Sequence, residues 1–138
     1  MPKWKKGPKD WSPSGYIPGM PVWPEFVDAY LEASILSGDD QSGNPLFGRY
    51  TISDFAQEAV DKAVRDSNRF IDKNMKLLDK PGIARSQHGH EFWMARNYHD
   101  AGFRDRRYVP NGHILRETAG EFGREQVIVG GDDKLRFL

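Results

Sequence analysis

The sequence of 138 residues contains no cysteine. This absence excludes disulfide bonds, thiolate metal ligands, thiol redox motifs and cysteine nucleophiles. The chain also has no surplus of either charge, because 20 lysines and arginines balance 20 aspartates and glutamates. A balanced charge gives no general attraction to nucleic acid, anionic membranes or acidic substrates. Any such attraction must come from a local group of residues.

Long apolar runs are missing as well. No stretch approaches the roughly 18 apolar residues of a membrane span, and the first 24 residues lack the apolar centre of a secretory signal. We therefore predict a protein with no membrane partner. The length suits one domain of common size with its own hydrophobic core.

Residues 1–23 form the first distinct segment, rich in proline and carrying Trp4, Trp11 and Trp23. Proline and glycine at this density disfavour both helices and strand ladders, so we predict an extended N-terminal arm. Exposed tryptophan rings are costly in water, so we expect this arm to dock on its own domain or on a partner.

The next part of the chain has helical spacing. Pro24 suits the first turn of a helix that Gly38 can end, and Thr51 or Ser53 can cap a longer helix that stops at Lys80-Pro81-Gly82. The predicted buried face of the longer helix consists of Phe55, Ala59, Ala63, Phe70, Ile71 and Leu78.

After Arg85 the pattern changes to short aromatic runs. "HEFWMARN" and "AGFRDRRYV" predict two strands of a hairpin, a short helix ending at Gly123 follows, and "EQVIV" and "KLRFL" around "GGDD" predict a second hairpin. The whole predicts a single α+β domain over residues 24–138, with two N-terminal helices followed by hairpin, helix and hairpin in a mainly antiparallel sheet.

The stretch "GHEFWMARNYHDAGFRDR", residues 89–106, resembles the motif "GHDFWLTRNGHGAGFWDR" of a family of small bacteriophage and plasmid proteins. The resemblance extends over roughly residues 25–138. It differs at Tyr98 and Asp100, where small residues are usual, and at Arg104, where a tryptophan is. The resemblance implies a mobile-element protein of the bacterial host cytoplasm, or of the virion if it is structural, and implies no particular activity.

Two enzymatic hypotheses rest on the histidines of this stretch. His88, His90 and His99 could ligate a metal, since imidazole is a good zinc ligand. His90 or His99 with Asp105 could serve acid/base hydrolysis, because a carboxylate can orient an imidazole and tune its pKa. The simpler interpretation is that these side chains only satisfy hydrogen bonds of the fold, and we expect no cofactor.

Two binding hypotheses use the arginines and aromatics instead. Cations beside aromatic rings are typical of single-stranded nucleic-acid binding, and the same residue types dominate protein interfaces. We favour a non-enzymatic protein that binds a host or phage protein, or itself, through residues 90–107 and the N-terminal arm. The predicted contact residues are Trp93, Arg96, Asn97, His99, Arg104, Arg106 and Arg107.

Overall fold

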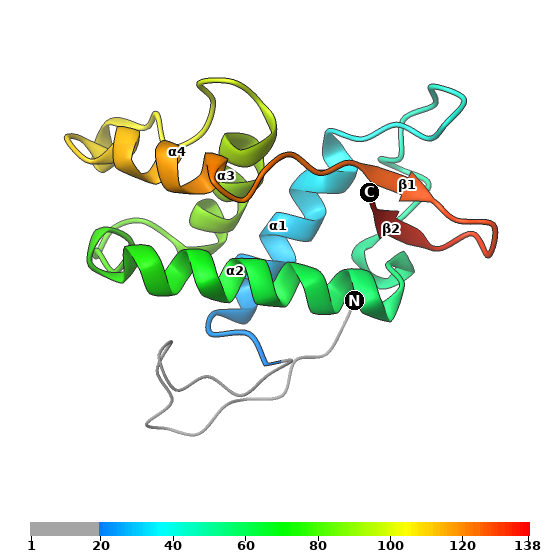
Figure 1. The fold of residues 1–138 in the computed structure, drawn as a ribbon, viewed down its shortest axis with the longest axis horizontal. Helices are drawn as coiled ribbons and strands as arrows, with labels where there is room; N and C mark the ends of the chain where they lie inside the picture. Colours follow the sequence, from blue (N-terminus) through cyan, green and yellow to red (C-terminus); the bar gives the residue numbers. More distant parts are fainter. Residues whose placement is uncertain (1–19) are drawn as a thin grey trace.

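Four α-helices and one two-stranded hairpin make up residues 20–138, the part of the chain that the computed structural model describes (Figure 1). The helices are α1 (Pro24–Leu36), α2 (Gln57–Leu78), α3 (Arg85–Asn97) and α4 (Gly112–Gly120), and the strands are β1 (Val127–Val129) and β2 (Leu135–Phe137). Short 3-10 turns cover Ile52–Asp54 and Arg106–Tyr108. This content confirms the α+β class. Of the predicted N-terminal arm, residues 1–19 lie outside the described residues.

Both N-terminal helices form, but α2 begins at Gln57 rather than after the predicted cap Thr51 or Ser53, so Phe55 precedes the helix. Pro24 occupies the first turn of α1, where its missing N–H costs no hydrogen bond. Thr51 precedes the 3-10 turn that leads into α2, and its backbone N–H donates to the Asp54 carboxylate at 2.7 Å. All six residues predicted for the buried face of the second helix are buried. No helix among residues 20–138 is long and apolar enough to cross a membrane.

The predicted hairpin over residues 90–107 is wrong: its first half lies in helix α3, and its second half is a loop. His88, Phe92 and Arg96 recur every four residues, and all three are buried on the face of α3 that points into the protein. The aromatic side chains have high strand propensity, yet this packing overrides it. Within residues 20–138 the sheet consists only of the antiparallel pair β1–β2, with Val127 opposite Phe137.

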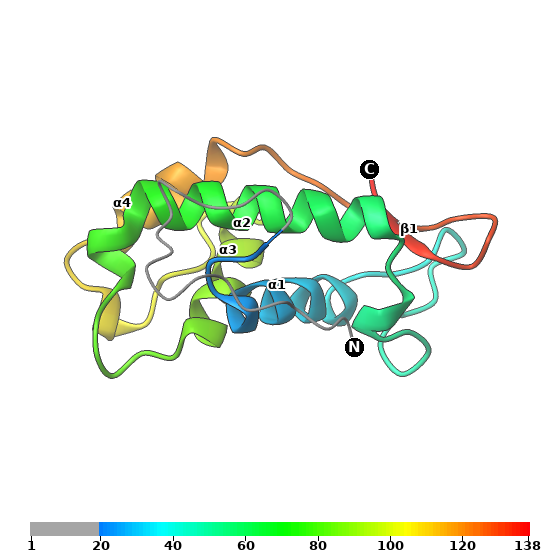
Figure 2. The ribbon, with the colours of Figure 1, turned by 90° about the horizontal axis from the view of Figure 1, so that it is seen from below.

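The core lies between α1, α2 and α3. Phe70 of α2 stacks on Phe92 of α3 with ring centroids 4.2 Å apart, and Phe26 of α1 packs against both rings. Figures 1 and 2 show α2 running along one side of the molecule, with the β1–β2 hairpin near its beginning and α4 near its end. The hairpin and α4 are thus held at opposite ends of one long helix.

Helices α1 and α3 approach each other at Gly89. A Cβ atom placed on Gly89 would lie 2.0 Å from the carbonyl oxygen of Phe26, which is backbone and cannot turn away. Glycine at this position therefore permits the close contact between the two helices. This requirement explains a glycine inside a helix, where it otherwise lowers helix stability.

Replacing Gly89 with alanine should lower the free energy of unfolding by about 3 kcal/mol or more, because the two backbones must move apart in a packed core. Denaturant unfolding followed by circular dichroism measures this loss. Gly120→Ala in α4 is the matched control: its Cβ would meet nothing within 4 Å, so it should be neutral or stabilise by roughly 0.5–1 kcal/mol. Equal effects of the two variants would contradict the close contact.

Candidate functional site

Three of the predicted contact residues point into the protein. The Trp93 ring is buried, and its Nε1–H donates to Ser37 Oγ at 2.8 Å. Asn97 donates to the Trp93 carbonyl at 3.0 Å and accepts from the backbone N–H of Glu125 at 2.8 Å. Trp93 and Asn97 therefore fasten α1 and the segment before β1 to α3. Helix α3 turns both side chains toward the protein, where they also line a cleft, and their role as contact residues stays a prediction.

Arg96 is the third inward residue. Its guanidinium donates to Tyr30 Oη at 2.9 Å and to Asp66 Oδ2 at 3.0 Å, and it also donates to the carbonyls of Gly123 and Phe122 at 2.8 and 3.0 Å. These partners come from α1, α2 and the segment after α4. A side chain with all these partners is occupied in holding the fold, so it cannot serve as the predicted binding cation.

Glu125 completes the polar cluster around Arg96. Its carboxylate lies 3.4 Å from the Arg96 guanidinium, accepts from the Tyr30 hydroxyl and pairs with Lys62 Nζ at 2.5 Å. Burial and the adjacent Glu125 carboxylate raise the pKa of the Tyr30 phenol well above its ordinary value. Tyr30 therefore stays protonated and donates a hydrogen bond to the Glu125 carboxylate. Tyr30, Arg96 and Glu125 thus act together to stabilise the fold.

The three histidines of the metal hypothesis do not converge. The His88 ring is buried, with Nδ1 2.8 Å from the Tyr108 hydroxyl and Nε2 2.9 Å from the Leu78 carbonyl. His90 and His99 are exposed. Among residues 20–138 no group of three histidine, aspartate or glutamate side chains is placed to hold a metal ion.

The acid/base hypothesis also lacks its contact. The Asp105 carboxylate caps the turn Arg106–Tyr108 and binds the Arg107 guanidinium at 2.9 and 3.0 Å. These hydrogen bonds lower the pKa of Asp105 to about 2. No hydrogen bond within residues 20–138 links Asp105 to His90 or His99. Arg107, also predicted as a contact residue, is engaged further with Gly82 and Gln87.

Contacts with helix α3 hold the backbone of the following loop, residues 98–107, in place. The Glu91 carboxylate accepts from the backbone N–H of Phe103 at 2.7 Å, and the Phe103 ring is buried. Gly102 has φ +84°, and a Cβ there would lie 2.6 Å from the Glu91 carbonyl. The exposed residues of the same loop include Tyr98, His99, Arg104 and Arg106. The loop therefore holds a fixed backbone while presenting Tyr, His and Arg side chains to solvent.

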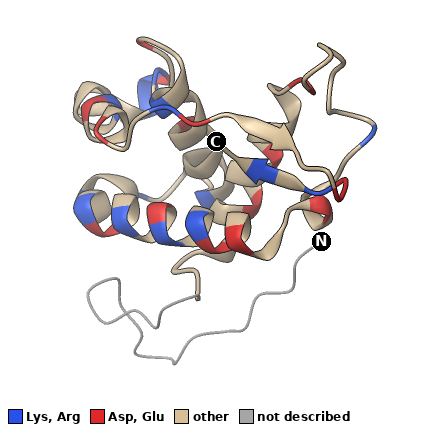
Figure 3. Cartoon of the chain, turned by 45° about the vertical axis from the view of Figure 1, so that its right-hand side comes forward, with Lys and Arg blue, Asp and Glu red and all other residues tan. Residues whose placement is uncertain are grey.

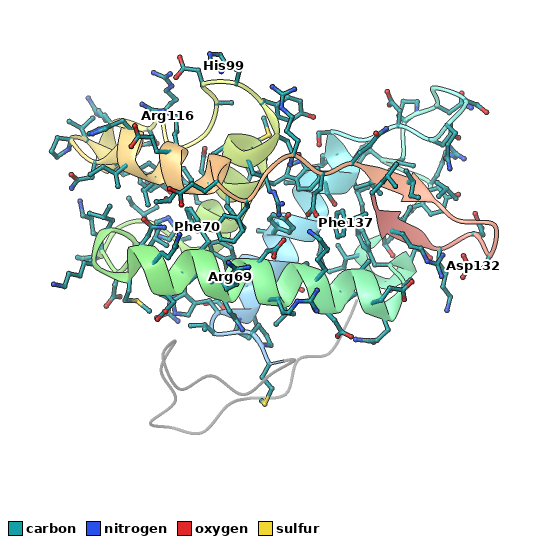
Figure 4. The ribbon with its side chains drawn as sticks, in the orientation of Figure 1. Arg69, Phe70, His99, Arg116, Asp132 and Phe137 are labelled. Carbon is teal, nitrogen blue, oxygen red and sulfur yellow. The ribbon has the colours of Figure 1, made fainter. Side chains whose placement is uncertain are left out.

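Tyr98 and Arg124 stand between two clefts, because both residues line each of them. The larger cleft has a volume of about 740 Å³ and includes Asp39, Asp40 and Gln41 in its wall. The smaller, about 440 Å³, lies between the loop and α4 and includes Arg116. Figure 4 shows His99 on the loop, with Arg116 on the neighbouring α4. We call the pair Tyr98 and Arg124 the Tyr98 ridge.

The smaller cleft carries mixed charge. Arg116, Arg124 and the two histidines His99 and His113 line it together with Asp100 and Glu117. Arg124 is exposed, and within residues 20–138 no carboxylate lies within ion-pair distance of it. Asp100, in contrast, already pairs with Arg104. The cleft therefore offers the available guanidinium of Arg124 beside Tyr98, a residue that is 42% exposed.

The sequence prediction missed Tyr98 and Arg124 as contact residues. They are separated by 26 positions along the chain, and only the packing of the segment after α4 beside the end of α3 brings them together. The predicted residues His99, Arg104 and Arg106 are exposed on the loop, and their role as contact residues stays a prediction. Comparison of the chain with protein-family models, curated proteins and solved structures finds no match.

The buried role of Arg96 predicts a large effect on stability. Arg96→Leu leaves the carboxylates of Asp66 and Glu125 without their guanidinium, so we expect a loss of about 3–5 kcal/mol in the free energy of unfolding. Arg104→Leu removes an exposed pair with Asp100 and should cost at most about 1 kcal/mol. Denaturant unfolding of both variants measures the difference. A mild effect of Arg96→Leu would contradict the buried cluster.

His88 predicts a pH dependence. Burial lowers the pKa of the His88 imidazole below its ordinary value near 6.5, so below that pH the unfolded chain binds a proton that the folded chain resists. The contribution to stability is complete above pH 6.5 and is lost as the pH falls through the folded pKa. Unfolding free energies measured across this range should therefore rise with pH, and His88→Gln should remove that part of the slope. His90→Gln, at an exposed position, should keep it; loss of the slope in both variants would contradict this assignment.

Proposed function

We propose that the protein is a non-enzymatic binding protein whose contact surface is the Tyr98 ridge together with the outward side chains of the loop 98–107. The main support for this proposal is that helix α3 holds the backbone of the loop 98–107 in place. That backbone is fixed by Glu91 and Gly102, while Tyr98, His99 and Arg104 are exposed. A fixed backbone means that little conformational entropy is lost on binding, which favours affinity.

The chemistry of the ridge favours a protein partner. Tyrosine and arginine supply most of the energy at protein interfaces, because each combines a large contact area with a polar group. A protein partner can pack around Tyr98 and Arg124 and also fill the clefts on either side of them. Arg124 is available for a carboxylate of the partner, and guanidinium groups bind carboxylates with two parallel hydrogen bonds.

Single-stranded nucleic acid is a weaker candidate for this surface. Base stacking requires exposed rings, and Phe92, Trp93 and Phe103 are all buried in the core. Tyr98 is the exposed ring that remains among the aromatics of residues 89–106. One ring supports a protein contact better than a stacking surface for several bases.

The resemblance of residues 89–106 to small bacteriophage proteins supports a bacterial host protein or a phage protein as the partner. Self-association through the same ridge fits the chemistry equally. Both versions propose binding by the same residues, and they differ in whether the bound chain is a second copy. Size-exclusion chromatography with light scattering separates them.

The experiment is an affinity capture from nuclease-treated bacterial lysate, combined with the mass measurement in solution. We expect either a recovered host protein or a dimer, and the double variant Tyr98→Ser with Arg124→Ser should lower that binding at least about tenfold, as the loss of two central contacts does. Phe47→Ser with Arg49→Ser is the matched control, because it removes one exposed ring and one exposed arginine elsewhere.

Two outcomes would refute this proposal. The first is a monomer that captures nothing. The second is a partner that both double variants bind as well as the wild type does, since the contact would then lie away from the Tyr98 ridge.

A further inference from the structure

Helix α2 carries a row of cations along its outward side. Lys62, Arg65, Arg69 and Lys73 are separated by three or four positions, so at 3.6 residues per turn they fall within an arc of about 80°. Lys76 continues the row beyond Asn74, whose φ of −122° and ψ of 18° depart from helical values. We call these five residues the α2 cation row. Figure 3 shows basic and acidic segments alternating along α2.

Three members of the α2 cation row are available to a ligand. Arg65, Arg69 and Lys76 are exposed, and within residues 20–138 no carboxylate lies within ion-pair distance of them. Arg69 is held in place by the Phe122 ring, with its guanidinium carbon 5.6 Å from the ring centroid. Lys62 and Lys73 instead pair with Glu125 and Glu121.

Acidic residues of α2 flank this row, and Asp66 pairs with its member Lys62 at 2.9 Å and with the buried Arg96 at 3.0 Å. Asp61 and Asp72 lie at the edge of the row, each three or four positions from one of its available cations, although within residues 20–138 no ion pair joins them. Glu58 lies at the start of the helix and pairs with Arg136. The positive charge that α2 offers to a ligand therefore comes from Arg65, Arg69 and Lys76, although the chain is neutral as a whole.

The spacing of the row suits a chain of phosphates. Residues 65 to 76 span about 17 Å at 1.5 Å per residue, and neighbouring cations one turn apart lie about 6 Å from each other along the axis. Phosphates of one strand of a duplex recur about every 3.4 Å along its axis, so cations about 6 Å apart can each contact a different phosphate. Arginine and lysine are the side chains that contact these phosphates, largely without regard to sequence.

We propose that the α2 cation row binds the phosphate backbone of double-stranded nucleic acid, independently of its sequence. The duplex is favoured over a single strand because no exposed residue of α2, a helix wholly within the described residues, is aromatic. Without rings to stack on bases, the row can contact only the backbone. This surface is distinct from the Tyr98 ridge, so the two proposals stand or fall separately.

The experiment measures fluorescence anisotropy of a labelled mixed-sequence DNA duplex of about 20 base pairs, titrated with the full chain. For three phosphate contacts the logarithm of the affinity should fall with the logarithm of the salt concentration with a slope of about −2.7, so binding weakens roughly 40-fold between about 50 and 200 mM salt. The triple variant Arg65→Gln, Arg69→Gln and Lys76→Gln should lose most of the binding and nearly all of the slope.

Two further variants test the row itself. Arg49→Gln with Arg85→Gln and Lys134→Gln removes the same number of exposed cations elsewhere, so it should bind the duplex within about twofold of the wild type. Asp72→Asn removes an acid beside the row and should strengthen binding. Circular dichroism and the thermal midpoint verify that each variant is folded.

Several results would overturn this inference. Failure of the wild-type chain to bind the duplex at low salt is one, and an equal loss in both triple variants is another, because it would indicate a general effect of charge. Tighter binding to a single strand of the same sequence would overturn the assignment to duplexes. Failure of the Tyr98 ridge to capture a partner would leave these results unaffected.

Discussion

The fold depends on one buried guanidinium. Arg96 of α3 binds Tyr30 of α1 and Asp66 of α2, and it also binds two carbonyls in the segment that leads to β1. Burying a charge is costly unless its hydrogen-bonding groups are satisfied, so the surrounding segments are constrained to positions that supply the partners. The aromatic packing around Phe92 supplies much of the apolar contact, and Arg96 fixes how the helices and the segment before β1 are placed around it.

The helical half of the fold could be predicted because local signals and burial agree there. Pro24 marks the start of α1, and the apolar spacing of α2 matches its buried face. The region after Arg85 could not be predicted in this way. Its aromatic side chains favour strands, while its buried residues recur at helical spacing. The deciding contacts are long-range: Gly89 against Phe26 and Arg96 against Asp66. No pattern within one segment reveals those partners.

The candidate site was predictable only in part for the same reason. The sequence pattern predicts Arg104 and Arg106 on a strand, but their closeness to His99 in sequence keeps the three residues near one another on the loop that forms instead. Trp93 and Asn97 have the chemistry of contact residues, and only the direction in which α3 turns them shows that Trp93 is buried and Asn97 half-buried. Arg124 joins Tyr98 through tertiary packing, so its part in the ridge has no sequence signal.

Arginine illustrates why residue type alone does not assign function in this chain. Arg96 and Arg107 hold their own protein together, through Asp66 and Asp105 respectively. Arg124 and Arg65 have no carboxylate within ion-pair distance among residues 20–138, although they have the same chemistry. A guanidinium that the fold has already paired would need to break those bonds to bind a ligand, whereas an available one would not. The division between paired and available cations therefore separates the residues that build this protein from those that can bind something else.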